Sequence, residues 1–182
     1  LILPDSPREW HFGNLKVIPD YVDGIRIYKG IEANIISIEG ETDLPMKYDS
    51  MLDIVLAGFH SLTPYSEEST EEENTKTLEN VIKRGEVDIL AHLGNPKYPF
   101  DKERIVKLAK DYNVAIEINN SSFEKSRKGS ESHCLEILKL CVKYGTYISL
   151  GSDTHFSYNI GNFSKIESLV NSSGIKQEKV LN

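Results

Sequence analysis

Short apolar runs alternate with segments whose apolar residues recur at helical spacing along most of the chain. A continuous apolar run predicts a buried strand, and apolar residues three and four apart predict an amphipathic helix. Strands are expected at 52–60, 87–92, 114–119 and 147–153, with one or two more in 24–35, and helices at 70–84, 101–112, 131–144 and 163–171. Repeated strand–helix units with apolar strands are typical of a parallel α/β sheet covered by helices.

The number of strands leaves the architecture open at this level. A closed α/β barrel usually needs more strands than this pattern shows. An open doubly wound sheet fits the pattern equally well. Ser69 or Thr70 is expected to cap the helix at 70–84, because glutamates follow in its first turn, and Gly85 is expected to end it.

Each predicted strand ends in a polar residue that can bind a metal or a substrate. In α/β folds the carboxyl ends of parallel strands share one rim, so residues far apart in sequence are expected to meet there. The residues at the strand ends are Glu32, His60, His92, Asn119 with Asn120, and Asp153 with His155.

Taken singly, these residues have simpler explanations. A lone histidine is more often a hydrogen-bonded structural residue than a ligand, and Asp153 alone is more often a turn or capping residue. Glu32 is harder to explain this way, because a carboxylate between Ile31 and Ala33 is costly to bury unless it is paired or bound to a cation. Together the set suits zinc, manganese or iron.

A basic segment follows the predicted strand at 114–119. Arg127 and Lys128 belong to the densest basic group in the chain, and Gly129 and Ser130 lead into a helix N-terminus. Such a segment can be a charged surface loop. At a strand-end rim it becomes a candidate phosphate clamp, in which Arg127 can make a bidentate contact. Asn119 and Ser121 are candidate substrate-binding residues beside it.

Composition narrows the classes of function. The chain has 182 residues and a net charge of −7, which suits one globular domain and disfavours general nucleic-acid coating. No apolar run approaches the length of a membrane span.

Cys134 and Cys141 lie on the apolar face of one predicted helix, about 10 Å apart along its axis, which is too far for a disulfide. They are expected to be reduced core residues of a cytoplasmic protein.

Several motifs together resemble one enzyme superfamily. The segments "GIEANI", "AGFH", "AHLGNPKY", "EINNSSFEKSRKGSESHC" and "LGSDTH" resemble the PHP (polymerase and histidinol phosphatase) superfamily, with the bacterial YcdX-type phosphatases as the nearest match. The resemblance runs over nearly the whole chain. It implies a distorted seven-stranded, TIM-like (βα)7 barrel with a metal cluster, usually of three zinc ions, at its rim, with manganese or iron as alternatives.

The resemblance also implies roles for individual residues. Glu32 would bridge two metals, His60 and His92 would bind one of them, Asp153 would complete the other, and His155 would bind a third. Glu32 and Asp153 would thus hold the catalytic centre around a metal-bound water. The family's opening His-x-His strand is missing, so we expect residues 1–182 to form a single domain that lacks the first one or two strands and is slightly incomplete at its C-terminus.

The leading hypothesis is a metal-dependent phosphatase that hydrolyses a small phosphomonoester. No nucleophile elbow or P-loop is present that would indicate a covalent or nucleotide-cradling mechanism. The alternatives are a histidinol phosphatase, a PHP-type exonuclease, which the acidic charge disfavours, and a degenerate metal-binding regulatory module without activity. The expected partner is a small phosphorylated substrate, without membrane or nucleic acid.

Overall fold

The computed structural model describes residues 2–3, 6–8, 10–123, 127 and 129–182. The strands are β1 (Tyr21–Val22), β2 (Ile25–Arg26), β3 (Gly30–Asn34), β4 (Ile54–Gly58), β5 (Ile89–Leu90), β6 (Ala115–Asn119) and β7 (Ile148–Gly151). The α-helices are α1 (His11–Asn14), α2 (Glu71–Arg84), α3 (Lys102–Tyr112), α4 (Ser130–Tyr144) and α5 (Glu167–Ser172). Short 3-10 turns lie at Leu15–Val17, Met46–Met51, Asn120–Phe123, Ser157–Asn159 and Gln177–Lys179.

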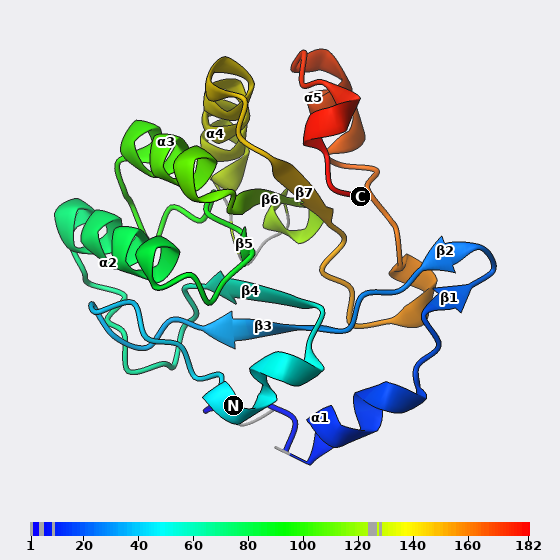
Figure 1. Cartoon of the computed structure of the whole chain (residues 1–182). Helices are drawn as coiled ribbons and strands as arrows, with labels where there is room; N and C mark the ends of the chain where they lie inside the picture. Colours follow the sequence, from blue (N-terminus) through cyan, green and yellow to red (C-terminus); the bar gives the residue numbers. More distant parts are fainter. Residues whose placement is uncertain (1, 4–5, 9, 124–126, 128) are drawn as a thin grey trace.

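The central sheet of the described residues is parallel and winds in one direction. Its strands lie in the order β3-β4-β5-β6-β7, which is also their order in the chain. Helices α2, α3 and α4 connect successive strands and lie side by side, with α3 packed against both neighbours (Figure 1). A doubly wound sheet reverses its strand order part-way, so that alternative is wrong. The seven-stranded closure stays a prediction.

The main helices begin and end where local chemistry favours it. Thr70 caps α2 in a reciprocal capping box with Glu73, and Gly85 ends the helix with a φ of 70°. Asp101 caps α3 by accepting a hydrogen bond from the backbone N–H of Arg104. The predicted helix at 70–84 is therefore confirmed with Thr70 as its cap. The last helix begins at Glu167, later than the pattern predicted.

The segment before the central sheet contains a β-hairpin. Strands β1 and β2 pair antiparallel, with Val22 opposite Ile25. Asp23 and Gly24 form the two-residue turn and both have positive φ, at 49° and 82°, as a tight hairpin turn requires. The run at 24–35 therefore forms two strands, β2 and β3, which is one of the two alternatives that the sequence left open.

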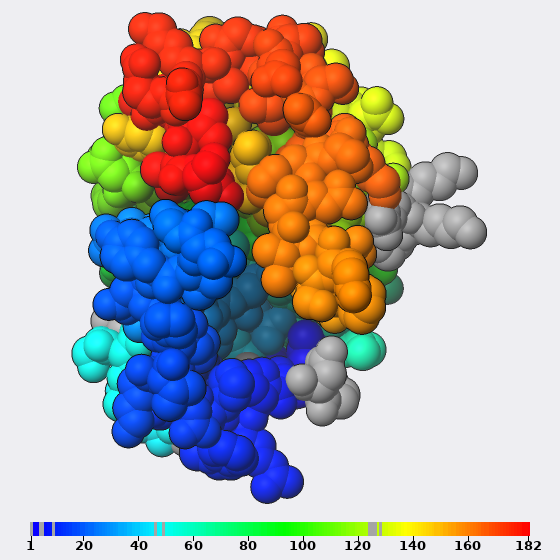
Figure 2. Space-filling view, turned by 90° about the vertical axis from the view of Figure 1, so that its right-hand side faces the viewer, coloured from blue at the N-terminus to red at the C-terminus, as the bar shows by residue number. Residues whose placement is uncertain are grey.

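One face of the molecule is hollowed. Figure 2 shows the blue N-terminal segment on one side of a hollow and the orange segment, which follows β7, on the other. The chain end returns to β7, where the backbone N–H of Leu181 donates to the carbonyl of Ile148 at 2.9 Å. None of the helices in the described part of the chain is long and apolar enough to cross a membrane.

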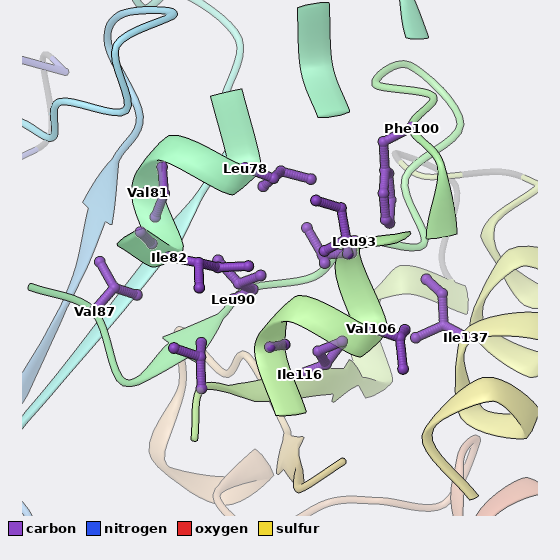
Figure 3. Close-up of a cluster of buried hydrophobic side chains, with 14 of the residues drawn as sticks. Leu78, Val81, Ile82, Val87, Leu90, Leu93, Phe100, Val106, Ile116 and Ile137 are labelled. Atoms are coloured by element: carbon purple, nitrogen blue, oxygen red, sulfur yellow. The ribbon is translucent and has the colours of Figure 1, made fainter. Parts of the chain in front are cut away.

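The hydrophobic core lies between the sheet and the helices. Side chains of α2 and α3, such as Leu78 and Val106, pack onto Leu90 of β5 and Ile116 of β6 (Figure 3). Cys134 and Cys141 are free and buried, as predicted. Two other apolar residues, near helix C-termini, are more exposed: Tyr112 at 49 % and Val142 at 36 %.

Candidate metal centre

Three of the predicted ligands meet at the carboxyl ends of neighbouring strands. Glu32 lies on β3, His60 follows β4, and His92 follows β5. Strand register places Glu32 beside Leu56 on the sheet face opposite to the helices, because Ala33 and Ala57 occupy the helix-covered face. The parallel sheet therefore delivers the three side chains to one place, as the strand-end argument predicted.

The ligand atoms of these three residues converge closely. Glu32 Oε1 lies 3.0 Å from His60 Nε2 and 2.8 Å from His92 Nε2. The two Nε2 atoms are 3.0 Å apart, and the rings are nearly perpendicular, at 84°. One carboxylate oxygen and two imidazole nitrogens within 4.8 Å of one another form a set that can hold a metal ion.

In the trio formed by Glu32, His60 and His92, electrostatics favour an ionised carboxylate at Glu32 and a neutral ring at His92. Burial would raise the pKa of Glu32, but hydrogen bonds from His60 and His92 outweigh it and hold that pKa far below its usual value. Burial lowers the pKa of His92. A neutral imidazole and an ionised carboxylate are the forms that bind a divalent cation.

The donor chemistry of the trio fits zinc. Zinc takes nitrogen and oxygen ligands from histidine and carboxylate side chains. Two facing Nε2 atoms cannot both donate into the gap between them, and a cation there would satisfy both nitrogens and Glu32 Oε1 together. His60 Nδ1 is buried and has no hydrogen-bond partner among the described residues, so the polar contacts of this ring all run through Nε2.

A small residue makes room for His92, the most buried of the three candidate ligands. A Cβ on Gly58, at the end of β4, would lie 2.8 Å from His92 Cε1. Any larger residue there would push the imidazole away. His92 itself has a positive φ of 45°, which is unusual for a residue with a side chain and indicates a backbone fixed by its surroundings.

A buried glutamate that the strand-end argument overlooked holds His92 in place. Glu117 Oε2 accepts a hydrogen bond from the His92 backbone N–H at 2.9 Å and another from Asn119 Nδ2 at 3.2 Å. Burial raises the pKa of Glu117 to about 8, and the charge of Glu32 adds to the rise. Glu117 lies between Ile116 and Ile118, so the signal that marked Glu32 was also present here.

Asp153 and His155 form a second group next to the first. Asp153 Oδ2 accepts hydrogen bonds from Arg127 Nη1 at 3.0 Å and from Asn119 Nδ2 at 3.2 Å. His155 Nε2 lies 3.6 Å from Asp153 Oδ1, and its side chain is 89 % exposed. Asp153 has a positive φ of 48°. Asn119 thus links this group through Glu117 to His92.

Three of the four predicted substrate-binding residues lie in the described part of the structure. Ser121 Oγ donates to the carbonyls of Ser152 and Asp153, at 3.3 and 3.4 Å, so it braces the segment after β7. Arg127 is mostly buried against Asp153. Lys128 lies outside the described residues. Asn119, Ser121 and Arg127 therefore all contact the Asp153 segment.

Comparison with known proteins identifies the relatives of the chain. It is 44 % identical over 180 residues to a probable phosphatase of Aeromonas hydrophila, spanning 98 % of this chain and 72 % of that protein. It is 47 % identical over 180 residues to a probable phosphatase of Proteus mirabilis, spanning 99 % and 73 %. The chain belongs to this family of probable phosphatases. A scan against family models gave no match.

Solved structures of other proteins share the fold of this chain. Histidinol phosphate phosphatase from Lactococcus lactis, solved with zinc, L-histidinol and phosphate, aligns with a TM-score of 0.57 at 16 % identity, over 90 % of this chain and 70 % of that one. A chain in an archaeal ribonuclease P structure with mature tRNA aligns with a TM-score of 0.60 at 21 % identity, over 93 % and 70 %. At these identities the likeness shows the fold alone.

Proposed function

We propose that this phosphatase is a metal-dependent hydrolase of small phosphomonoesters from the PHP superfamily, close to its YcdX-type members. The observation that carries the proposal is the convergence of Glu32, His60 and His92 at the rim of a parallel sheet. The names of its relatives and the fold shared with a histidinol phosphate phosphatase support it.

In this proposal, side chains of the chain hold the cations and the phosphate. Glu32, His60 and His92 would hold one cation, and Asp153 and His155 would contribute to further ones, up to three, with zinc favoured over manganese or iron. When bound, such cations lower the pKa of a water molecule and offset charge on the phosphoryl oxygens. Glu117 fixes the backbone at His92, which keeps the imidazole directed toward Glu32.

Arg127 is the proposed phosphate-binding cation. Among the described residues the only hydrogen bond from its guanidinium runs from Nη1 to Asp153, so its other guanidinium N–H groups would be available to an anion. Asn119 and Ser121 would position this clamp, and Lys128 would add charge beside it. With free, buried cysteines, we place the protein in the cytoplasm, with a small phosphorylated molecule as its partner.

Turnover of p-nitrophenyl phosphate tests the proposed function. The purified protein is stripped with a chelator and assayed with zinc, manganese or ferrous iron added back. We expect activity that depends on metal and is lost again on chelation. Absence of chelator-sensitive turnover with every metal would show the proposal to be wrong.

Matched histidine variants assign that activity to the trio. We expect His60→Ala and His92→Ala to lower kcat/KM at least about 100-fold, because each removes a ligand atom. His133→Ala, on α4 beside Lys102 and Glu136, is the control and should retain wild-type activity. Equal loss in all three variants would argue against the trio.

A further inference from the structure

A cavity of about 430 Å³ is lined in part by Asp153 and His155, the second group of candidate ligands. It lies between the segment after β6, which gives Asn120, Ser121 and Arg127, and the segment after β7, which includes Asp153 and His155. Asp153 connects the cavity to the metal-binding trio through Asn119, Glu117 and the backbone of His92. The volume suits a small ligand, so there is room for more than a phosphate group.

Three asparagines give the cavity wall neutral hydrogen-bond donors. Asn120 Oδ1 accepts from the backbone N–H of Lys165 at 3.0 Å, and Asn162 Oδ1 accepts from that of Ser164 at 3.1 Å. In the described part of the chain, no hydrogen bond engages the amide NH2 of Asn120, Asn159 or Asn162. Amide NH2 groups without a partner, two of them on side chains held through Oδ1, suit hydroxyl and ether oxygens of a ligand.

The charges in the cavity disfavour an amine. Among the described lining residues Asp153 is the only carboxylate, and Arg127 and Asn119 already engage it. An ammonium group on a ligand would find no unpaired carboxylate there and would lie near the Arg127 guanidinium. Burying a charge without a partner is unfavourable.

An exposed aromatic ring supplies an apolar wall. Phe156 is 62 % exposed and lines the cavity, with Tyr158 tilted against it at 5.3 Å between ring centroids. An aromatic face beside amide and hydroxyl groups matches a molecule with carbon–hydrogen bonds on one face and hydroxyls at its edge. A sugar ring has this form.

We propose that this cavity binds the leaving-group part of the substrate, and that this part is a neutral polyhydroxylated group. The substrate class is then the sugar and polyol monophosphates, with Arg127 on the phosphate and Asn159, Asn162 and Phe156 on the sugar. This inference rests on the proposed phosphatase function.

A matched pair of substrates tests the inference. Glucose 6-phosphate and glucosamine 6-phosphate differ by one hydroxyl replaced with an ammonium group. With the metal-loaded full chain, we expect kcat/KM to be at least tenfold higher for glucose 6-phosphate. Equal values, or a preference for glucosamine 6-phosphate, would overturn the inference.

A charge introduced into the cavity should change this preference. Asn162→Asp provides a carboxylate of nearly the same shape, so we expect the glucose-to-glucosamine ratio of kcat/KM to fall at least fivefold. Asn171→Asp, which makes the same change on α5 away from this cavity, is the control and should leave the ratio unchanged. A ratio that Asn162→Asp leaves unaltered would count against the cavity as the sugar site.

p-Nitrophenyl phosphate separates failure of the inference from failure of the proposed function. If this substrate is turned over in a chelator-sensitive way but glucose 6-phosphate is not preferred over glucosamine 6-phosphate, the inference alone is wrong. If neither p-nitrophenyl phosphate nor any sugar phosphate is turned over with any metal, both are wrong.

Discussion

Glu117 shows how one buried side chain can organise a site that it does not itself form. Its carboxylate joins the His92 backbone to Asn119, and Asn119 continues to Asp153. The fit is close, because a Cβ on Gly151 would collide with Glu117 Oε1. A residue in this position sets the distance between the two candidate ligand groups.

Removing Glu117 should therefore weaken metal binding without removing a ligand. We expect Glu117→Ala to lower zinc affinity about 10- to 100-fold, as loss of outer-shell support typically does. Glu117→Gln keeps an oxygen that can accept from His92 and Asn119, and should retain most of the affinity. Chelator-competition titrations measure both variants. If Gln weakens binding as much as Ala, hydrogen-bond positioning is not the role of Glu117.

At the scale of single elements, the sequence predicts where strands and helices lie along the chain better than how they are arranged in space. The buried strands were visible because both of their faces are covered or lie at the site, so their apolar runs are continuous. Because parallel strands end at one rim, the sequence was enough to predict that Glu32, His60 and His92 lie close together. The single direction of winding depends on which face each helix covers, which periodicity does not encode. The left-handed backbone at His92 depends on Glu117 from another strand.

Helices α2 and α3 are joined by an ion pair whose effect should depend on pH. Arg104 Nε donates to Glu79 Oε1 at 2.6 Å, and Arg104 Nη1 reaches the exposed Glu72 at 3.3 Å. The hydrogen bond from Arg104 lowers the pKa of Glu79 below its ordinary value of 4.5. The ion pair therefore stabilises the fold above pH 4.5, and this stabilisation is lost as the pH falls through the folded-state pKa of Glu79.

We expect Glu79→Gln to lower the free energy of unfolding at pH 7, and to do so more than Glu72→Gln. The difference between wild type and Glu79→Gln should shrink as the pH falls from 4.5 through the folded-state pKa of Glu79, because the wild-type carboxylate then becomes protonated and neutral as well. Urea denaturation at pH 7 and pH 3 measures this. A difference that stays constant between the two pH values would contradict the assignment.

At the scale of the whole molecule, the core and the candidate metal centre are separate. The core lies between the sheet and the helices, as Figure 3 shows, whereas the trio sits at the strand ends. The fold should therefore form without metal, and metal should add stability by binding the native state.

Zinc should raise the melting temperature of the stripped protein. At free zinc 100-fold above Kd the gain is about 2.7 kcal/mol, which corresponds to about 5 to 10 °C for a chain of this size. Differential scanning calorimetry with and without zinc measures it, and chelation should reverse it. The melting temperature of His60→Ala should respond little. An equal rise in that variant would mean that zinc stabilises the protein from another place.

The one-directional winding of the sheet has a consequence for how such proteins diversify. The five strands of the parallel sheet all end at the same rim, while the segment that follows each strand can change in length or content without disturbing its neighbours. The segment after β7 supplies Phe156, Asn159 and Asn162, and the strands before it supply the trio. On the proposed roles, related proteins would keep the trio and its chemistry, and changes in the segment after β7 would alter the substrate.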